Sequence, residues 1–230
     1  MTIKHSFCPK PWMHTSMNNR GDLRTCCTIN LLPFSFLTKE DETRYNAKTD
    51  LFPRNHKYTK ILRASMLAGE RHPMCRRCWE IEDAGLVSSR FAWQNYFFPG
   101  FEEKAIELTQ EDGTIDPKDF PIQSYDLRFG NLCNSKCVIC GPAISSMWGE
   151  VTDWSDGNLE NPYIQELLNS AEHITRLYVT GGEPMINKNH WRLIDTLIQK
   201  GHSKNITIDY NTNCVLLTKE MLDKRRQSVV

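Results

Sequence analysis

The sequence lacks the features of a membrane or secreted protein. No apolar run approaches the roughly 18–20 residues that a membrane-spanning helix needs. Residues 1–8 also lack the apolar core of a signal peptide. We therefore expect a soluble, cytoplasmic protein with no membrane partner.

Net charge is absent as well. Lys+Arg and Asp+Glu number 28 each in a chain of 230 residues, so the formal net charge is zero. A neutral protein needs a local basic patch to bind nucleic acid. The basic support for such a patch is limited to Arg76-Arg77 and Lys224-Arg225-Arg226. Runs this short are usually solvated surface, so nucleic acid is not an expected partner.

Cysteine, in contrast, is abundant. The nine cysteines are an odd number, and several are only two or three residues apart. Both features argue against a disulfide framework and in favour of metal ligation. Hydrophobic residues make up 40% of the chain, which is an ordinary fraction for a folded protein with a packed core.

One cysteine motif follows a predicted strand directly. Cys133, Cys137 and Cys140 have a C-x3-C-x2-C spacing and come after the strand expected at 124–129. Thiolates this close can bind three irons of one small cluster, and no fourth cysteine follows in the same loop. A four-iron cluster held by three thiolates keeps one iron open, and an open coordination position is where metal chemistry takes place.

A second set of cysteines lies nearer the N-terminus. Cys75 and Cys78 form a C-x2-C pair that can direct two thiolates at one metal centre, and Cys8 and Cys26 precede them. Four thiolates would close the coordination shell, so such a site would be structural or electron-transferring. A four-cysteine zinc site is an alternative that the residues leave open.

The C-terminal half predicts alternating strands and helices. Apart from the helix expected at 58–68, the expected helices are at 144–151, 161–171 and 189–200, and the strands are at 124–129, 174–180 and 205–210. This alternation predicts a parallel sheet. The turn Gly181-Gly182-Glu183-Pro184 follows the second strand, and its glycines permit positive φ and a close approach of backbone to a ligand. Parallel α/β folds bind ligands at this carboxyl edge.

The combination of these motifs resembles the radical S-adenosylmethionine (SAM) superfamily over about residues 122–217. The likeness lies in the C-x3-C-x2-C loop, the Gly-Gly-Glu-Pro turn and Thr212-Asn213, where the family has Thr-Asn-Gly and this chain has Cys214. It implies a 4Fe–4S cluster on Cys133, Cys137 and Cys140. It also implies SAM bound by Gly181, Gly182, Glu183 and Asn213.

The same resemblance implies an activity. An electron donor would reduce the cluster, SAM would be cleaved to a 5′-deoxyadenosyl radical, and the radical would abstract hydrogen from a peptide or small-molecule substrate. No catalytic acid or base can be named. Ile139 stands where the family commonly has an aromatic residue. The family's partial barrel has more strands than are predicted here, so a fragment or a partner subunit that completes the barrel is expected. Whether this chain is an enzyme by itself is left open.

The N-terminal cysteines resemble the twitch module, a short relative of the SPASM domain that holds one auxiliary 4Fe–4S cluster. The likeness lies in Cys8-Pro9-Lys10-Pro11-Trp12, in Gly21 before Cys26, and in Cys75-x2-Cys78. The order departs from the family, where this module usually follows the barrel. The resemblance implies an auxiliary cluster on Cys8, Cys26, Cys75 and Cys78.

The expected fold is α/β. An incomplete radical SAM (β/α) barrel of about three parallel strands at 122–230 is preceded by a small, irregular, cysteine-rich α+β module at 1–90 and an aromatic-rich connector at 91–121. The alternative function is a non-catalytic iron–sulfur or zinc-binding module or fragment that acts in electron transfer or with a partner subunit.

Overall fold

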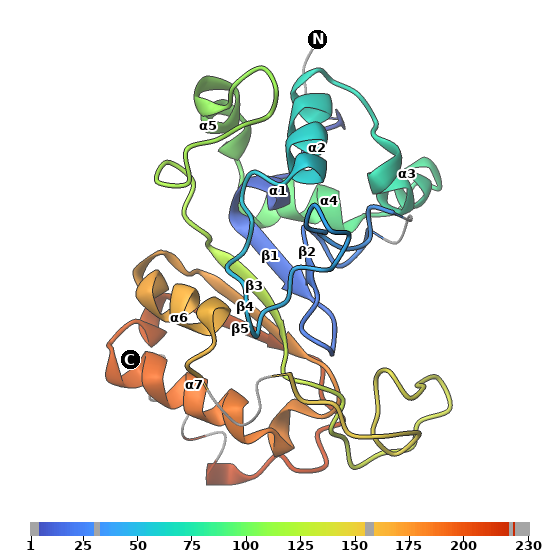
Figure 1. Cartoon of the computed structure of the whole chain (residues 1–230), viewed down its shortest axis with the longest axis vertical. Coiled ribbons are helices and arrows are strands. Elements are labelled where there is room, and N and C mark those ends of the chain that lie inside the picture. Colours follow the sequence, from blue (N-terminus) through green and yellow to red (C-terminus); the bar gives the residue numbers. More distant parts are fainter. Residues whose placement is uncertain (1–4, 30–32, 155–158, 221–222, 224–230) are drawn as a thin grey trace. The chain divides into compact units, whose positions relative to one another are not determined.

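The computed structural model describes residues 5–29, 33–154, 159–220 and 223. The chain forms two compact units, each made from several segments (Figure 1). The first unit comprises Met1–Ser16, Arg24–Arg44 and Pro53–Ile122, and the second comprises Met17–Leu23, Tyr45–Phe52 and Gln123–Val230. Within the described ranges, no helix is long and apolar enough to cross a membrane.

The first unit consists of short helices around an apolar core. Its helices are α1 (Lys10–Met13), α2 (Lys57–Leu67), α3 (Arg76–Asp83), α4 (Ser89–Ala92) and α5 (Phe101–Leu108), with the short 3-10 helix η2 (Pro73–Cys75) and the π-helical segment η3 (Trp93–Phe97). The core includes Phe7, Trp12, Leu62, Met66 and Phe120. Strands β1 (His14–Met17) and β2 (Leu23–Arg24) each contribute residues to both units.

Helix α2 confirms the helix predicted at 58–68. Its N-terminus is capped by His56, whose Nδ1 accepts a hydrogen bond from the Tyr58 amide at 3.2 Å. Leu62 and Met66 lie one turn apart and are both buried, which gives the helix an apolar face. Gly69 follows the last turn with a φ of +79°, a conformation that glycine adopts without a Cβ penalty.

Helix α2 also carries a fully buried guanidinium group. Arg63 donates hydrogen bonds to the carbonyl oxygens of Pro11 at 2.7 and 3.0 Å, Arg54 at 2.7 Å and Gly113 at 3.2 Å. The backbone at Gly113 packs so closely that an added Cβ would lie 2.0 Å from the Lys60 carbonyl oxygen. Arg63 therefore joins three separate segments of the first unit to α2.

Residues 91–121, predicted as a connector, pack within the first unit. The Phe101 ring lies 6.0 Å from the Phe120 ring and 6.5 Å from the Phe7 ring, measured between centroids. Trp12 Nε1 donates to Thr109 Oγ1 at 2.8 Å. The division between the units falls after Ile122. The assignment of residues 1–90, 91–121 and 122–230 to separate functional modules stays a prediction.

The second unit contains three parallel strands, in the order β3 (Ser124–Arg128), β4 (Arg176–Thr180) and β5 (Thr207–Tyr210). Helices α6 (Pro162–Asn169) and α7 (Lys188–Gln199) lie between the strands in sequence, with the short turns η4 (Ala171–His173), η5 (Pro184–Ile186) and η6 (Ser203–Asn205). The three predicted strands and the helices predicted at 161–171 and 189–200 are confirmed within two residues at each end.

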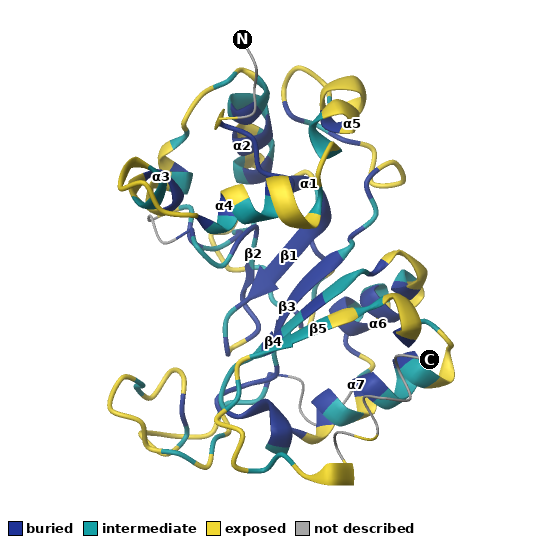
Figure 2. Ribbon diagram, turned by 180° about the vertical axis from the view of Figure 1, so that it is seen from behind, coloured by how far each residue is buried: buried dark blue, intermediate teal, exposed yellow. Residues whose placement is uncertain are grey.

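One face of these strands packs against the helices. Leu127, Leu177 and Val179 are completely buried, and α7 contributes the buried Leu193 and Leu197 (Figure 2). Asn187 caps the N-terminus of helix α7, because its side-chain Oδ1 accepts hydrogen bonds from the amides of Asn189 and His190. This packing fixes the carboxyl ends of β3 and β4, from which the two predicted ligand turns start.

The helix predicted at 144–151 is wrong. Those residues form a succession of turns. Ser145 Oγ donates to the Ser135 carbonyl at 2.9 Å, and Ser146 Oγ accepts from the Cys133 amide at 3.1 Å. The serine hydroxyls thus bind the preceding cysteine loop, which gives the segment an alternative to helical hydrogen bonds.

The alternation of apolar and charged residues at 124–129 is typical of a strand with one buried face, but β3 is buried on both faces. Its polar residues Ser124 and Asp126 are buried along with the apolar ones. The Asp126 carboxylate lies 3.2 Å from Arg128 Nε. The alternation of polar and apolar residues therefore marks two buried faces of different chemistry, because a charged partner two residues away compensates the buried carboxylate.

Candidate functional site

The three-cysteine loop follows β3 and lies at the carboxyl edge of the parallel strands. Cys137 is exposed, while Cys133 and Cys140 are half-buried. Burial, and then the neighbouring Cys137 and Cys133 thiols, raise the pKa of Cys140. Both neighbouring thiols are close enough to Cys140 to affect its pKa. The structure therefore gathers the three predicted ligands in one loop.

Side chains downstream of the loop hold its backbone. Trp148 Nε1 donates to the Cys137 carbonyl at 2.9 Å, and the Lys136 ammonium lies 4.5 Å from the centroid of the Trp148 ring. The Cys140 amide donates to the Cys137 carbonyl at 3.1 Å. These contacts give the loop a defined course while its thiols stay accessible.

Asn131, which no sequence motif singled out, organises the base of the loop. It is fully buried, and its Nδ2 donates to the carbonyls of Pro142 and Glu150, both at 2.8 Å. Its Oδ1 accepts from the Thr152 amide at 2.7 Å. One side chain before the loop thus satisfies three backbone groups that follow it. The sequence signal for this role is the presence of an amide residue between the predicted strand and the first cysteine.

The two glycines of the Gly-Gly-Glu-Pro turn are required by close packing of backbone. Gly181 has a φ of +120°, and an added Cβ at Gly182 would lie 2.0 Å from the Leu132 carbonyl oxygen. The Gly182 amide donates to the Gly130 carbonyl at 3.0 Å. The close approach that these glycines allow is, in this structure, an approach to residues 130–132 at the start of the cysteine loop.

Glu183 connects the turn to both neighbouring motifs. Its amide donates to the Leu132 carbonyl at 2.7 Å. Its carboxylate is only 2% exposed and accepts from the Met185 amide at 3.0 Å and from Thr212 Oγ1 at 2.6 Å through Oε1, and from the Asn213 amide at 2.8 Å through Oε2. The buried negative charge is therefore compensated by three donors of the chain itself.

Asn213 connects the turn after β5 to the cysteine loop. Its Nδ2 donates to Asn134 Oδ1 at 2.8 Å and to Ser135 Oγ at 2.9 Å, both inside the cysteine loop. The structure thus brings the predicted cofactor residues Gly181, Gly182, Glu183 and Asn213 next to the predicted metal ligands. Thr212 was missed as a site residue, although it lies beside Asn213 in the same short motif.

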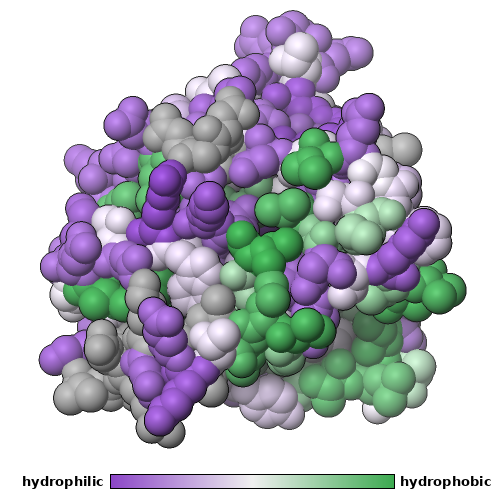
Figure 3. Space-filling model, turned by 90° about the horizontal axis from the view of Figure 1, so that it is seen from below, coloured by the Kyte–Doolittle hydropathy of each residue, from purple (hydrophilic) through white to green (hydrophobic). Residues whose placement is uncertain are grey.

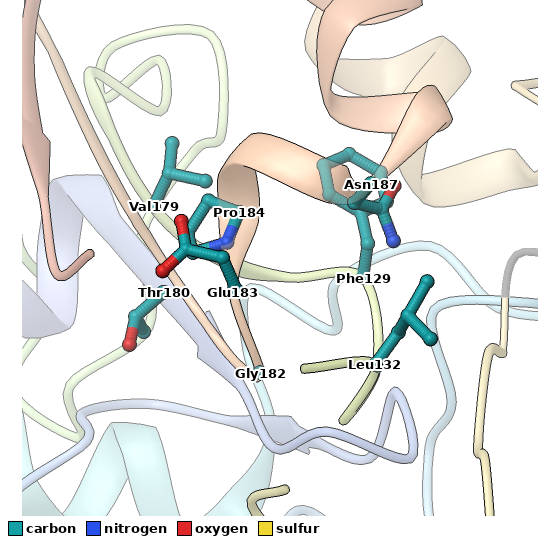
Figure 4. Close-up of a pocket in the computed structure, with 9 residues that line it drawn as sticks. Phe129, Leu132, Val179, Thr180, Gly182, Glu183, Pro184 and Asn187 are labelled. Atoms are coloured by element: carbon teal, nitrogen blue, oxygen red, sulfur yellow. The ribbon is translucent and has the colours of Figure 1, made fainter. Parts of the chain in front are cut away.

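A pocket of about 210 Å³, part of it open to solvent, lies beside these hydrogen bonds (Figure 4). The residues that line it come from the ends of β3 and β4 and the turns that follow them: Phe129, Gly130, Leu132, Val179, Thr180, Gly182, Glu183, Pro184 and Asn187. Gly182 and Glu183 of the Gly-Gly-Glu turn line the pocket, which combines apolar walls with backbone polar groups, as small-molecule sites do.

The surface around the cysteine loop is rich in exposed apolar side chains. Val138 and Ile139 are each 95% exposed, and Ile144, Met147, Trp148 and Val151 are also largely accessible. Figure 3 shows apolar groups gathered between polar ones on the face seen from below. Exposed apolar groups of this density are typical of surfaces that bury a ligand or another segment.

In the first unit, the four remaining predicted ligands line one pocket. The pocket has a volume of about 310 Å³, part of it open to solvent, and Cys8, Cys26, Cys75 and Cys78 all border it. These cysteines come from before α1, after β2, the end of η2 and the first turn of α3. Cys75 is half-buried, and the other three are buried. Four thiols that are up to 70 residues apart in sequence therefore converge.

The pKa values of these thiols reflect their mutual proximity. Burial raises the pKa of Cys8 to about 12, and burial followed by the Cys8, Cys26 and Cys78 thiols raises that of Cys75 well above its usual range. A hydrogen bond with Cys27 is the main cause that lowers the pKa of Cys26. Cys27, adjacent in sequence, thus acts on a predicted ligand without lining the pocket.

Two cationic side chains border the same pocket. Lys10 and Arg90 are both buried. Within the described residues, no three His, Cys, Asp or Glu side chains surround a point suited to a single metal ion. The thiolates of an iron–sulfur cluster bind different irons and are spaced more widely than around one ion. Four thiols beside two buried cations fit an anionic metal–thiolate centre by the chemistry of the donor set.

Part of the chain matches a known protein family. Residues 127–229 match the family model described as Radical SAM superfamily. The matched range contains the three-cysteine loop, the Gly-Gly-Glu turn and Asn213, and it does not reach the four cysteines of the first unit. Comparisons with curated proteins and with solved structures gave no match.

Proposed function

We propose that residues 127–229, which match the Radical SAM superfamily model, bind a 4Fe–4S cluster through Cys133, Cys137 and Cys140. The same residues would bind SAM at the adjoining Gly181–Glu183 turn. SAM-dependent radical chemistry is the general property of the superfamily. The assignment of individual residues, and the action on a peptide or small-molecule substrate, are the proposed part. When bound, the cluster and SAM supply reductive cleavage of a sulfonium bond and hydrogen abstraction.

The hydrogen bonds that join the three motifs support this proposal. The Glu183 amide binds the Leu132 carbonyl, the Glu183 carboxylate binds the Asn213 amide, and the Asn213 side chain binds Ser135. Residues from three different strand ends are thereby held beside the three thiols. A fixed arrangement of this kind is what a site for one cofactor bound to another requires.

The chain's own groups have distinct tasks in this proposal. The three thiolates would hold the cluster and leave room for SAM beside it. Backbone carbonyls of Gly181 and Gly182 would accept hydrogen bonds from the SAM ammonium, while Glu183 and Asn213 keep the turn and the cysteine loop in register. Ile139, which is exposed next to Cys140, offers apolar contact to the adenine ring.

We further propose that Cys8, Cys26, Cys75 and Cys78 hold an auxiliary 4Fe–4S cluster. Support comes from the shared pocket and from the two buried cations beside it, which suit the net negative charge of a cluster with four thiolates. A closed set of four cysteine ligands leaves no open iron, so this centre would store or transfer electrons.

Cleavage of SAM tests the first assignment. The full chain, reconstituted anaerobically with iron and sulfide, should release 5′-deoxyadenosine when dithionite and SAM are added. Cys137→Ala should abolish this release. Cys214→Ala removes an exposed cysteine outside the ligand set and should retain the iron of both centres. Iron binding without any SAM cleavage in the native chain would instead favour a non-catalytic electron-transfer module.

Metal content tests the second assignment. The native chain should bind about eight irons, roughly four for each cluster, and Cys75→Ala should lose about half of them. The Cys137→Ala chain should keep the absorbance of the auxiliary centre. Stoichiometric zinc without iron would contradict both cluster assignments. If Cys75→Ala kept all its iron, the auxiliary cluster would be excluded.

A further inference from the structure

Lys10 is a buried lysine whose ammonium points into the four-cysteine pocket. It is only 4% exposed and lies on α1, two residues after Cys8. Its Nζ donates to Ser89 Oγ at 2.9 Å and to Cys26 Sγ at 3.9 Å. It also lies 4.6 Å from the centroid of the Trp93 ring. Lysine is almost never buried unless a partner of opposite charge or electron density is present.

Arg90, the other cation at this pocket, has a different environment. Its guanidinium forms an ion pair with the Glu82 carboxylate and donates to the Phe7 carbonyl at 2.7 Å. The guanidinium is therefore paired with a carboxylate and donates to oxygen atoms. The charge of Arg90 also acts to lower the pKa of Cys75, and its backbone forms a hydrogen bond with Cys78. Lys10 is the cation whose ammonium approaches a predicted metal ligand at hydrogen-bonding distance.

The surroundings of Lys10 make its charge effective over a short distance. The hydroxyl of Ser89 and the face of Trp93 hold the ammonium in place, and burial excludes the water that would screen it. The potential of an iron–sulfur cluster depends on net charge, on hydrogen bonds to its sulfur atoms and on solvent exposure. Lys10 supplies a positive charge and a hydrogen bond to the Cys26 sulfur, and its own burial agrees with low solvent exposure at the pocket.

We propose that Lys10 raises the reduction potential of the centre held by Cys8, Cys26, Cys75 and Cys78. Reduction adds one electron, supplied by a one-electron reductant such as dithionite, and so adds one negative charge to the centre. The ammonium is attracted more strongly to the reduced state than to the oxidised state. Lys10 is thus a tuning residue and not a ligand. The inference rests on the proposed auxiliary cluster.

The test is a potentiometric titration of the full chain that carries Cys133→Ala, Cys137→Ala and Cys140→Ala, so that the auxiliary centre alone gives the paramagnetic resonance signal of the reduced cluster. Lys10→Met is compared with this parent. Lys10→Arg keeps the charge, and Lys10→Gln keeps a donor for Ser89 but is neutral. Lys118→Met removes an exposed lysine of the same unit and serves as the control.

We expect Lys10→Met and Lys10→Gln to lower the ratio of reduced to oxidised cluster at a fixed potential at least tenfold, a shift of about 59 mV for a one-electron couple. Lys10→Arg and Lys118→Met should stay near the parent.

Two results would overturn it. One is an unchanged midpoint in Lys10→Met or Lys10→Gln with normal iron content. The other is an equal loss of iron in all three Lys10 variants, because packing and not charge would then be responsible. Absence of iron from the parent itself is a separate outcome, since it contradicts the auxiliary cluster before any Lys10 variant is made.

Discussion

The Glu183 carboxylate holds the backbone of Asn213, because its Oε2 accepts a hydrogen bond from the Asn213 amide at 2.8 Å across 30 residues of sequence. The bond joins the turn after β4 to the turn after β5. Because Glu183 is buried, water does not compete for the bond, and the negative charge strengthens it. This hydrogen bond positions the backbone of Asn213, and therefore also the side chain that contacts the cysteine loop.

Replacing Glu183 should therefore destabilise the second unit. In Glu183→Gln an amide NH2 takes the place of one carboxylate oxygen and opposes a donor from Met185, Thr212 or Asn213. We expect a loss of about 1–3 kcal/mol in the free energy of unfolding, measured by urea denaturation of the full chain. Glu172→Gln, at an exposed position of the same unit, should change it by less than about 0.5 kcal/mol. Equal stability of the two variants would refute the structural role of Glu183.

Gly182 offers a test of the backbone packing at the site. Gly182→Ala places a methyl group where the Leu132 carbonyl oxygen is 2.0 Å away, so the turn and the cysteine loop must separate. Overpacking of this kind costs about 1–3 kcal/mol, measured by thermal melting of the full chain. Gly141→Ala is the matched control, because Gly141 has open space at the same atom and lies just after the last cysteine of the loop. A melting temperature for Gly182→Ala equal to that of Gly141→Ala would contradict the packing.

Replacing Arg63 should destabilise the first unit more than replacing Arg71 does. Arg63→Met keeps much of the side-chain length but leaves the carbonyls of Pro11, Arg54 and Gly113 without their donor. Unsatisfied buried acceptors cost about 1–3 kcal/mol each, so a loss of roughly 3 kcal/mol or more is expected in urea unfolding. Arg71→Met removes a partly exposed ion pair with Asp83 and should cost less than about 1 kcal/mol. The reverse order of the two variants would be inconsistent with the packing around α2.

His56 should make the first unit less stable in acid. Burial is the main cause that lowers the pKa of His56 below its ordinary value. Its Nδ1 must be unprotonated to accept from the Tyr58 amide. The unfolded state therefore binds the proton more readily, so stability that is present above about pH 6.5 declines as the pH falls through that value.

The corresponding measurement compares urea unfolding at about pH 7.5 and pH 5.5. Asn is also a good helix cap and does not titrate in this range, so His56→Asn should lose less stability on acidification than the native chain. His173→Asn, at an exposed position, should behave as the native chain does. A pH dependence that His56→Asn leaves unaltered would assign the acid sensitivity to other groups.

Much of the second unit followed from local patterns. The strands β3, β4 and β5 and the helices α6 and α7 lie within two residues of their predicted ends, because periodicity, caps and glycine terminators are local properties. The helix expected at 144–151 failed for a tertiary reason: Ser145 and Ser146 bind residues of the cysteine loop about ten residues earlier. Apolar spacing carried no information about those partners.

The site shows the same division. The sequence singled out the seven cysteines and the Gly-Gly-Glu turn by residue type and spacing. It did not single out Asn131, which spans the base of the loop, or Lys10, which was named only as part of a motif. A single asparagine or lysine has many ordinary uses, so its role is visible only once its neighbours in space are known.

The sequence by itself determined which atoms are available for chemistry: thiols at fixed short spacings, two adjacent glycines at a strand end, and no excess charge to attract a polyanion. The tertiary structure decided how they are used. It turned the Glu183 carboxylate onto the Asn213 turn, packed Gly182 against the cysteine segment and buried the Lys10 ammonium beside Cys26. Such contacts join residues far apart in the chain, and local patterns do not specify them because each depends on how separate elements pack.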